Sequence, residues 1–156
     1  MEKKIDNELA LFKEQLELVN ISSKKEFIDK LQWFFLDLKQ GFAFVAKYQR
    51  VNLPNRFFYV DLVFYNRILK NFVLVNFRHG NLKIQDVEKM NLAIDYYSNN
   101  ERLEDDNQTV GIVIGKLKTD IVVKYRLPEN NEQIFASQYS TVLPNKEQLK
   151  QLLEKH

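Results

Sequence analysis

The sequence predicts one α/β domain built on a single sheet with helices packed against it. Helical apolar stripes lie near both ends of the chain, and the middle holds apolar runs of β-branched and aromatic residues interrupted by one helical segment. The length of 156 residues fits one domain and is ample for a buried core. The chain contains no internal repeat, low-complexity tract or interdomain linker.

The first two elements are predicted to be helices. Within residues 3–20, apolar side chains recur at alternating spacings of four and three, at Ile5, Leu9, Phe12, Leu16 and Val19. A second helix follows and stops near Gly41. We expect residues 1–20 to form an N-terminal amphipathic helix and residues 21–156 to form the domain itself. The first helix needs an apolar partner, either its own domain or a second copy of the chain.

The middle of the chain is predicted to form strands and one helix. Residues 42–48, 57–65 and 71–77 are apolar runs, with a turn at Pro54-Asn55 and a hairpin link at 66–70. Continuous apolar runs suit strands buried on both faces. Residues 84–98 have helical spacing, 99–108 form a polar loop, and 110–114 read as another buried strand.

The C-terminal part has a weaker pattern. Residues 121–125 fit either a short helix or a strand, and residues 133–140 predict a final strand. Pro144 precedes a terminal helix at 146–155.

Composition excludes several kinds of site. The chain has no cysteine, which excludes disulfides and thiolate metal sites and is compatible with a reducing cytoplasm. Only two histidines occur, His79 and His156, which argues against a His-rich zinc site. The net charge of +2 is too small to indicate nucleic-acid binding, so any basic patch must be local. The charged N-terminus is no signal peptide, and no apolar run approaches the ~18 residues needed to cross a bilayer. We therefore expect a soluble, cytoplasmic protein without a membrane partner.

Five segments in fixed order carry a family resemblance. They are GFAFVAKYQR (41–50), FYVDLVFYNRILK (58–70), KMN (89–91), DNQTVGIVIGK (106–116) and VLPNKEQLKQLL (142–153). Together they resemble the C-terminal nuclease-like domain of the YhcG family, a member of the PD-(D/E)XK group, over about residues 20–153. The resemblance implies a restriction-endonuclease-like mixed sheet flanked by helices in a single domain. It also implies a bacterial protein of DNA restriction, defence or mobile-element biology. Family members usually carry a separate N-terminal domain, and we expect the helix at 3–20 to stand in its place.

The chemistry of this family implies a metal site. Two carboxylates on the strands of a hairpin hold Mg²⁺ through oxygen ligands. The metal stabilises charge that develops on the scissile phosphate and lowers the pKa of the attacking water. A lysine two residues after the second carboxylate positions or activates that water, and a Glu and a Gln from the flanking helices complete the site.

Of the family's catalytic positions, this sequence keeps one unchanged. The resemblance places the first carboxylate at Asp61, the second at Asn76 and the lysine at Arg78, while Lys24 stands for the helical Glu and Asn91 for the Gln. Asp61 alone would hold Mg²⁺ weakly. Arg78 cannot serve as a base, because its pKa stays above ~12. Asp61, Lys24 and Arg78 together carry one positive charge without a metal, so we expect no cofactor, or Mg²⁺ if activity remains.

We therefore expect a nuclease-fold, DNA-binding pseudoenzyme whose metal-dependent phosphodiester cleavage is lost or weakened. Arg78 and Lys24 would take over the electrostatic role of the metal on phosphate. Other candidate contacts with the DNA backbone are Lys47, Arg50, Arg56, Arg67, Lys83 and Lys89. In the alternative interpretation, Asp61 and Arg78 form a buried ion pair and nothing more.

Two other functions stay open. The chain could be an active Mg²⁺-dependent endonuclease that uses Asp61 with the migrated residues Glu88 or Lys89, or a non-catalytic module for interaction or homodimerisation. We interpret His79 as a surface turn residue rather than a general base. The aromatic side chains are interpreted as core rather than as base-stacking platforms, namely Trp33, Phe34, Phe35, Phe57, Phe58, Phe64 and Phe72.

Overall fold

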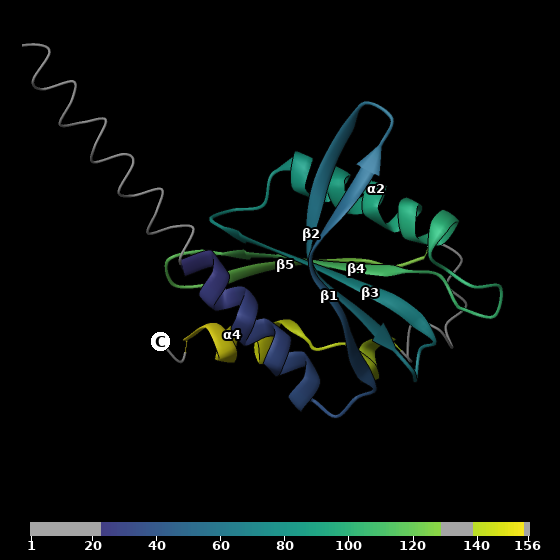
Figure 1. Ribbon diagram of the computed structural model, residues 1–156. Coiled ribbons are helices and arrows are strands. Elements are labelled where there is room, and N and C mark those ends of the chain that lie inside the picture. The colour runs from purple at the N-terminus through teal and green to yellow at the C-terminus, as the bar shows by residue number, and fades with distance from the viewer. Residues whose placement is uncertain (1–22, 129–138, 155–156) are drawn as a thin grey trace, which may run out of the picture.

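A computed structural model describes residues 23–128 and 139–154 and confirms the predicted mixed sheet flanked by helices (Figure 1). The predicted helix at 3–20 lies outside the described residues. In chain order the elements are a helix at 23–37, β1 (Phe42–Leu53), β2 (Arg56–Asn66), β3 (Asn71–His79), α2 (Ile84–Asn100), β4 (Val110–Lys116), β5 (Ile121–Arg126), a short helix at 139–142 and α4 (Lys146–Glu154). None of the described helices is both long and apolar enough to span a membrane.

The five strands lie in chain order across one sheet, β1-β2-β3-β4-β5. All neighbouring pairs are antiparallel except β3 and β4, which are parallel. A parallel pair needs a crossover connection, and α2 supplies it between these two strands. The order therefore places the hairpin of β2 and β3 at the centre of the sheet, next to the start of α2.

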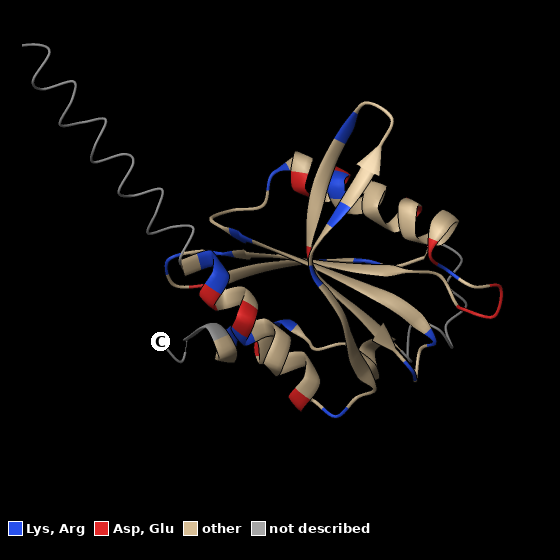
Figure 2. Ribbon diagram, in the orientation of Figure 1, with Lys and Arg blue, Asp and Glu red and all other residues tan. Residues whose placement is uncertain are grey.

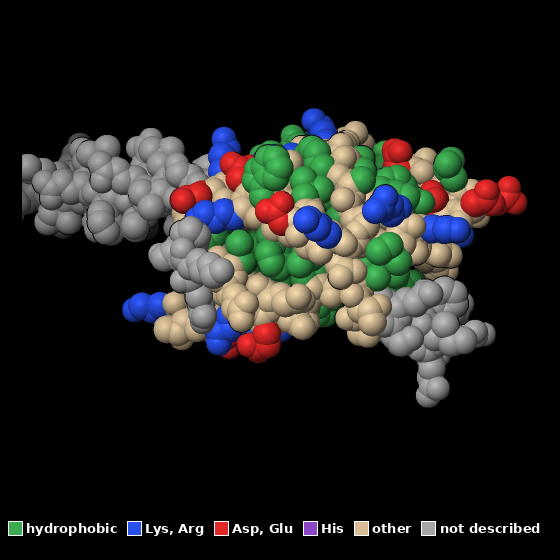
Figure 3. Space-filling model, turned by 90° about the horizontal axis from the view of Figure 1, so that it is seen from below, with side chains coloured by type: hydrophobic (Ala, Val, Ile, Leu, Met, Phe, Trp, Pro, Cys, Tyr) green, Lys and Arg blue, Asp and Glu red, His purple; other side chains and the backbone are tan. Residues whose placement is uncertain are grey.

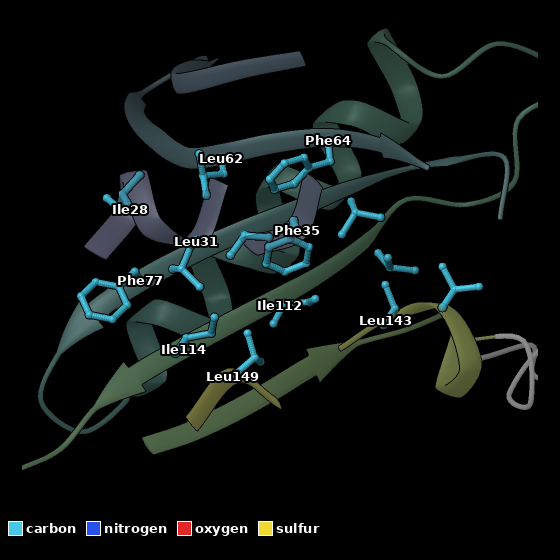
Figure 4. Close-up of a cluster of buried hydrophobic side chains, with 14 of the residues drawn as sticks. Ile28, Leu31, Phe35, Leu62, Phe64, Phe77, Ile112, Ile114, Leu143 and Leu149 are labelled. Atoms are coloured by element: carbon cyan, nitrogen blue, oxygen red, sulfur yellow. The ribbon is translucent and has the colours of Figure 1, made fainter. Parts of the chain in front are cut away.

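Each face of the sheet carries its own apolar layer. On one face the helix at 23–37 and the C-terminal helices cover β2, β3 and β4, and Figure 4 shows Ile28, Leu31 and Phe35 pointing toward those strands. On the other face α2 contributes Met90 and Ala93. The strands β3 and β4, and β2 from Val60 onward, are thus buried on both faces, as their continuous apolar runs predicted.

Two glycines allow close approaches to β4. A Cβ atom on Gly111 would lie 2.5 Å from Sδ of Met90, a residue of α2. A Cβ atom on Gly115 would lie 2.6 Å from the carbonyl oxygen of Gly80, in the loop between β3 and α2. These contacts are below ordinary van der Waals separation, so α2 and its leading loop can sit this close only because neither glycine has a side chain.

The β1–β2 hairpin continues beyond the rest of the sheet. The pairing of β2 with β3 covers only Leu62 to Asn66, whereas β1 and β2 stay paired as far as Leu53 and Arg56. Residues 49–60, which we call the arm, therefore form a two-stranded projection that rises past α2 (Figure 1). This region makes β1 longer than the predicted 42–48.

Three other expectations need correction or completion. Residues 121–126 form a strand, β5, which settles the ambiguity at 121–125. Of the strand predicted at 133–140, residues 133–138 lie outside the described residues, and 139–140 are helical. Phe35, Phe58 and Phe64 are buried as predicted, but Trp33 and Phe57 are 62% and 53% exposed. Trp33 lies on the outer side of its helix and Phe57 lies on the arm, so neither reaches the core.

Candidate functional site

The candidate site lies where β2 and β3 diverge. Their backbone ladder ends at the pair Leu62–Val75, and side chains bridge the strands beyond it. Oδ1 of Asn76 accepts the backbone N–H of Asp61 at 2.9 Å, and Oδ2 of Asp61 accepts the backbone N–H of Phe77 at 2.8 Å. The two side chains thus satisfy buried backbone donors that the separated strands can no longer pair with each other.

Lys24 contacts the other oxygen of the Asp61 carboxylate. This lysine comes from the first turn of the helix at 23–37, and its Nζ lies 3.6 Å from Oδ1 of Asp61. Both oxygens of Asp61 are therefore engaged, one by a backbone N–H and one by an ammonium group.

Burial raises the pKa of Asp61 above its ordinary value of 3.8. The nearby Lys24 ammonium and the Phe77 N–H both lower the pKa, but they offset the burial only in part. The imbalance has a geometric cause: the Asp61 side chain is 8% exposed, whereas that of Lys24 is 44% exposed, so water screens the pair. Keeping Asp61 ionised in the folded protein therefore costs free energy.

Arg78 pairs with Asp86, which corrects the expected pair with Asp61. Its NH1 nitrogen lies 3.1 and 3.2 Å from the two oxygens of Asp86. Asp86 belongs to the first turn of α2 and also accepts the backbone N–H of Lys83 at 2.8 Å. A carboxylate suits the positive end of a helix dipole, and α2 begins directly after β3, so Asp86 is fixed beside Arg78. Sequence reasoning did not single out Asp86, but its place as an acidic residue in the first turn of a predicted helix could have pointed to it.

A cavity of about 120 Å³ gathers most of the predicted site residues. It brings together three cations, Lys24, Arg78 and Lys89, against two carboxylates, Asp61 and Asp86. Two of those cations are paired with the carboxylates. Lys89 has no carboxylate partner within residues 23–128 and 139–154, so the cavity keeps one unpaired positive charge. Asn76, Tyr59, Phe77 and Val113 complete its lining.

Several predicted residues lie outside this cavity. Asn91 accepts a hydrogen bond from Nε of Arg126 at 2.9 Å and lines a separate cavity of about 380 Å³. Glu88 is exposed and does not line the Asp61 cavity. Lys47 forms an ion pair with Asp29 of the helix at 23–37.

The remaining basic candidates lie around the cavity rather than in it. Lys83 is exposed at the start of α2. Arg50 and Arg56 lie on the arm, and Arg67 is exposed in the turn between β2 and β3. Figure 2 shows these basic positions on the arm and at the start of α2.

His79 is not the surface turn residue that its position suggested. It ends β3 and packs its ring against Phe27 and Phe77, with centroid distances of 5.7 and 5.2 Å. Burial, followed by the charges of Lys116 and Lys24, lowers the pKa of His79. The ring does not line the Asp61 cavity, so it is not placed to act there as a base.

The residues around Asp61 do not fit a magnesium ion. Mg²⁺ is held by carboxylates that leave oxygens directed at the metal. Here the Asp61 oxygens face Lys24 and the Phe77 N–H, while the Asp86 oxygens face Arg78. Among the residues that the structure describes, no group of three or more His, Cys, Asp or Glu side chains could hold a metal. The two carboxylates of the cavity are already paired with cations, and a third cation, Lys89, adds to the positive charge that a magnesium ion would meet.

Comparison with known proteins identifies the family. The family model described as the YhcG PDDEXK nuclease domain matches residues 8–154, which extends beyond the 20–153 that the motifs cover. A curated relative, Putative nuclease YhcG of Escherichia coli (strain K12), is 31% identical over 140 residues. That alignment covers 87% of this chain and 37% of the relative, so the chain spans well under half of the relative's length. The chain belongs to the YhcG PDDEXK nuclease-domain family.

Proposed function

We propose that this member of the YhcG nuclease-domain family binds DNA through the Asp61 cavity, without a resident Mg²⁺ and with cleavage lost or strongly weakened. The observation that carries the proposal is the pairing of Asp61 with Lys24. The Lys24 ammonium lies 3.6 Å from Oδ1 of Asp61, the oxygen that the Phe77 N–H leaves open, and its charge competes there with a divalent cation. Asn76 supports the same conclusion, because its amide oxygen already accepts the Asp61 N–H.

Lys89 and Arg78 are the best-placed contacts for a phosphate group. Lys89 lines the cavity and has no carboxylate partner among the described residues. Arg78 is held in position by Asp86 and lines the same cavity. A phosphate at this point would meet a preformed pair of cations, and its binding would release counterions from DNA.

Salt-dependent binding to labelled DNA tests this proposal. For Lys89→Gln we expect weaker binding to every DNA sequence and a slope of log K against log salt that is smaller by about one. Lys70→Gln is a matched control, because Lys70 is an exposed lysine in the turn at the other end of β2. A wild-type protein with no salt-dependent affinity for DNA would overturn the proposal, and so would equal effects of the two variants.

A separate assay tests whether the protein still cleaves DNA. We expect no nicking of supercoiled plasmid by the wild type with either Mg²⁺ or Mn²⁺. Glu88 does not line the cavity, which argues against an active endonuclease that uses Asp61 with Glu88. Lys89 does line it, so the alternative that uses Asp61 with Lys89 is the one this assay decides. Metal-dependent nicking that disappears in Asp61→Asn would establish that activity and refute the loss of cleavage.

An interaction or homodimerisation module is the second candidate. The observation that favours it is the edge strand β1, which pairs only with β2 among the described residues and has Phe44, Val45 and Tyr48 exposed. An uncovered edge strand offers unpaired backbone groups to another chain. Sedimentation velocity over a range of concentrations tests this candidate. A monomer at all concentrations would leave no role for the edge in self-association.

A further inference from the structure

We propose that the arm stacks unpaired nucleobases of a single DNA strand on Phe57 and Tyr59, beside the cationic cavity. This inference rests on the proposed function, because the cavity must bind the phosphates of the same strand. Neither ring is needed for the core: Phe57 is 53% exposed and Tyr59 is 50% exposed.

The arm presents a continuous row of groups suited to planar bases. The rings of Phe57 and Tyr59 adjoin each other edge to face, with centroids 6.1 Å apart and planes at 87°, so each ring offers its own stacking surface. The guanidinium of Arg50 lies 3.8 Å from the centroid of the Phe57 ring. Arg50 is the cross-strand partner of Tyr59, so all three side chains share one face of the hairpin. Aromatic rings next to an arginine form a platform on which any base can stack.

The other face of the arm holds this row in place. Val51 and Val60 are fully buried, and Phe58 is nearly so, in the apolar layer that contains α2. Backbone pairing continues to the end of the arm, at Leu53 and Arg56. The exposed rings are therefore carried on a packed hairpin, which lowers the entropy lost when a ligand binds.

The row leads directly into the cavity. Side chains of a strand alternate in direction, so Phe57 and Tyr59 project from the same side of the arm, and Tyr59 lines the cavity together with Asp61. Four residues at about 3.3 Å each separate Phe57 from Asp61 by about 13 Å. Stacked nucleotides advance about 3.4 Å each along a strand, so about four of them cover this distance. Bases on the rings and a phosphate in the cavity can belong to one strand.

The positive charge of the arm favours nucleic acid as its ligand. The arm sequence QRVNLPNRFFYV contains two arginines and no acidic residue, and Figure 2 shows the basic positions on it. The carboxylates at its foot, Asp61 and Asp86, are already paired with Lys24 and Arg78. Base faces are hidden inside a duplex, so stacking on these rings requires unpaired bases.

The test compares three labelled DNAs by fluorescence anisotropy: a single strand, the same strand with abasic sites, and the duplex. For Phe57→Ala we expect affinity for the intact strand to fall roughly 5- to 150-fold, which corresponds to ~1–3 kcal/mol per stacked base. Affinity for the abasic strand and the salt slope should not change, because the ring contacts no phosphate. Phe57→Trp should restore binding. Thermal denaturation checks that each variant folds.

Trp33→Ala is the matched control. Trp33 is 62% exposed but lies on the helix at 23–37, across the sheet from α2. Figure 3 shows the face that carries this helix, where apolar side chains are interspersed with charges of both signs. We expect this variant to bind all three DNAs like the wild type.

Each contrary result has a distinct meaning. A wild type that binds none of the DNAs overturns the proposed function and the stacking together. Salt-dependent binding that Phe57→Ala leaves intact, or that falls equally for the abasic strand, overturns the stacking alone.

Discussion

Replacing Asp61 by Ala should cost stability that replacing it by Asn does not. The carboxylate accepts the backbone N–H of Phe77, a residue that is almost fully buried. Ala leaves that donor without a partner, and a buried unsatisfied donor costs ~1–3 kcal/mol. Asn keeps an acceptor oxygen at the same place and removes a buried charge. We expect Asp61→Asn to be at least as stable as the wild type at neutral pH and Asp61→Ala to be less stable than Asp61→Asn by that amount.

Thermal denaturation followed by circular dichroism measures the difference. For a domain of this size ~1 kcal/mol corresponds to about 2–4 °C in Tm, so the two variants should differ by roughly 2–12 °C. Equal Tm values for the two variants would mean that the Phe77 N–H does not depend on residue 61. The same pair improves the nicking assay, because lost activity in the Ala variant alone would not separate chemistry from folding.

The pH dependence follows from the raised pKa of Asp61. A carboxyl group whose folded pKa lies above its ordinary 3.8 binds its proton more tightly in the folded state. The resulting contribution to stability is present in full below pH 3.8 and is lost as the pH rises through the raised value. The advantage of Asp61→Asn over the wild type should therefore be largest at neutral pH and should shrink on acidification. An advantage that grows on acidification would refute the assigned direction of the shift.

Three further predictions concern neighbouring residues. Lys24→Met should raise the pKa of Asp61 further, measured by NMR titration of its side chain, and an unchanged pKa would show that the ion pair has no electrostatic effect. Asn76→Glu adds a second carboxylate, so Mn²⁺ should raise the Tm of this variant but not that of Asn76→Gln; binding at a hundredfold excess over Kd would add ~2.7 kcal/mol. Gly115→Ala would press a Cβ atom against the Gly80 carbonyl and should cost ~1–3 kcal/mol in urea denaturation, and wild-type stability would contradict this contact.

Most of the sheet could be predicted because its central strands are apolar on both faces. The runs at 57–65, 71–77 and 110–114 lie within β2, β3 and β4. The outer half of β1 could not be predicted, because Gln49, Arg50 and Asn52 interrupt the apolar pattern there. These residues are polar because β1 is an edge strand and its outer half exposes one face. Its strand geometry depends on a partner elsewhere in the chain, which periodicity does not reveal.

The site could be predicted only as far as backbone position determines it. Asp61 and Asn76 lie on adjacent strands, so the expected hairpin already made them neighbours. The partner of Arg78 depends instead on how α2 docks, which places Asp86 within reach. Helix geometry also separates Lys89 from Asn91: two residues on a helix differ by about 200° in direction. Because Lys89 faces the cavity, Asn91 turns away toward Arg126.

The side-chain bridge between Asp61 and Asn76 also joins the arm mechanically to the body of the domain. The arm begins at the point where β2 leaves β3, and there the two strands are connected through the carboxylate and the amide rather than through a backbone ladder. Tilting of the arm about this point would strain these bonds. Amide hydrogen exchange at Asp61 and Phe77 should therefore respond to events at the far end of the hairpin, and slower exchange there would report that a ligand holds the arm still.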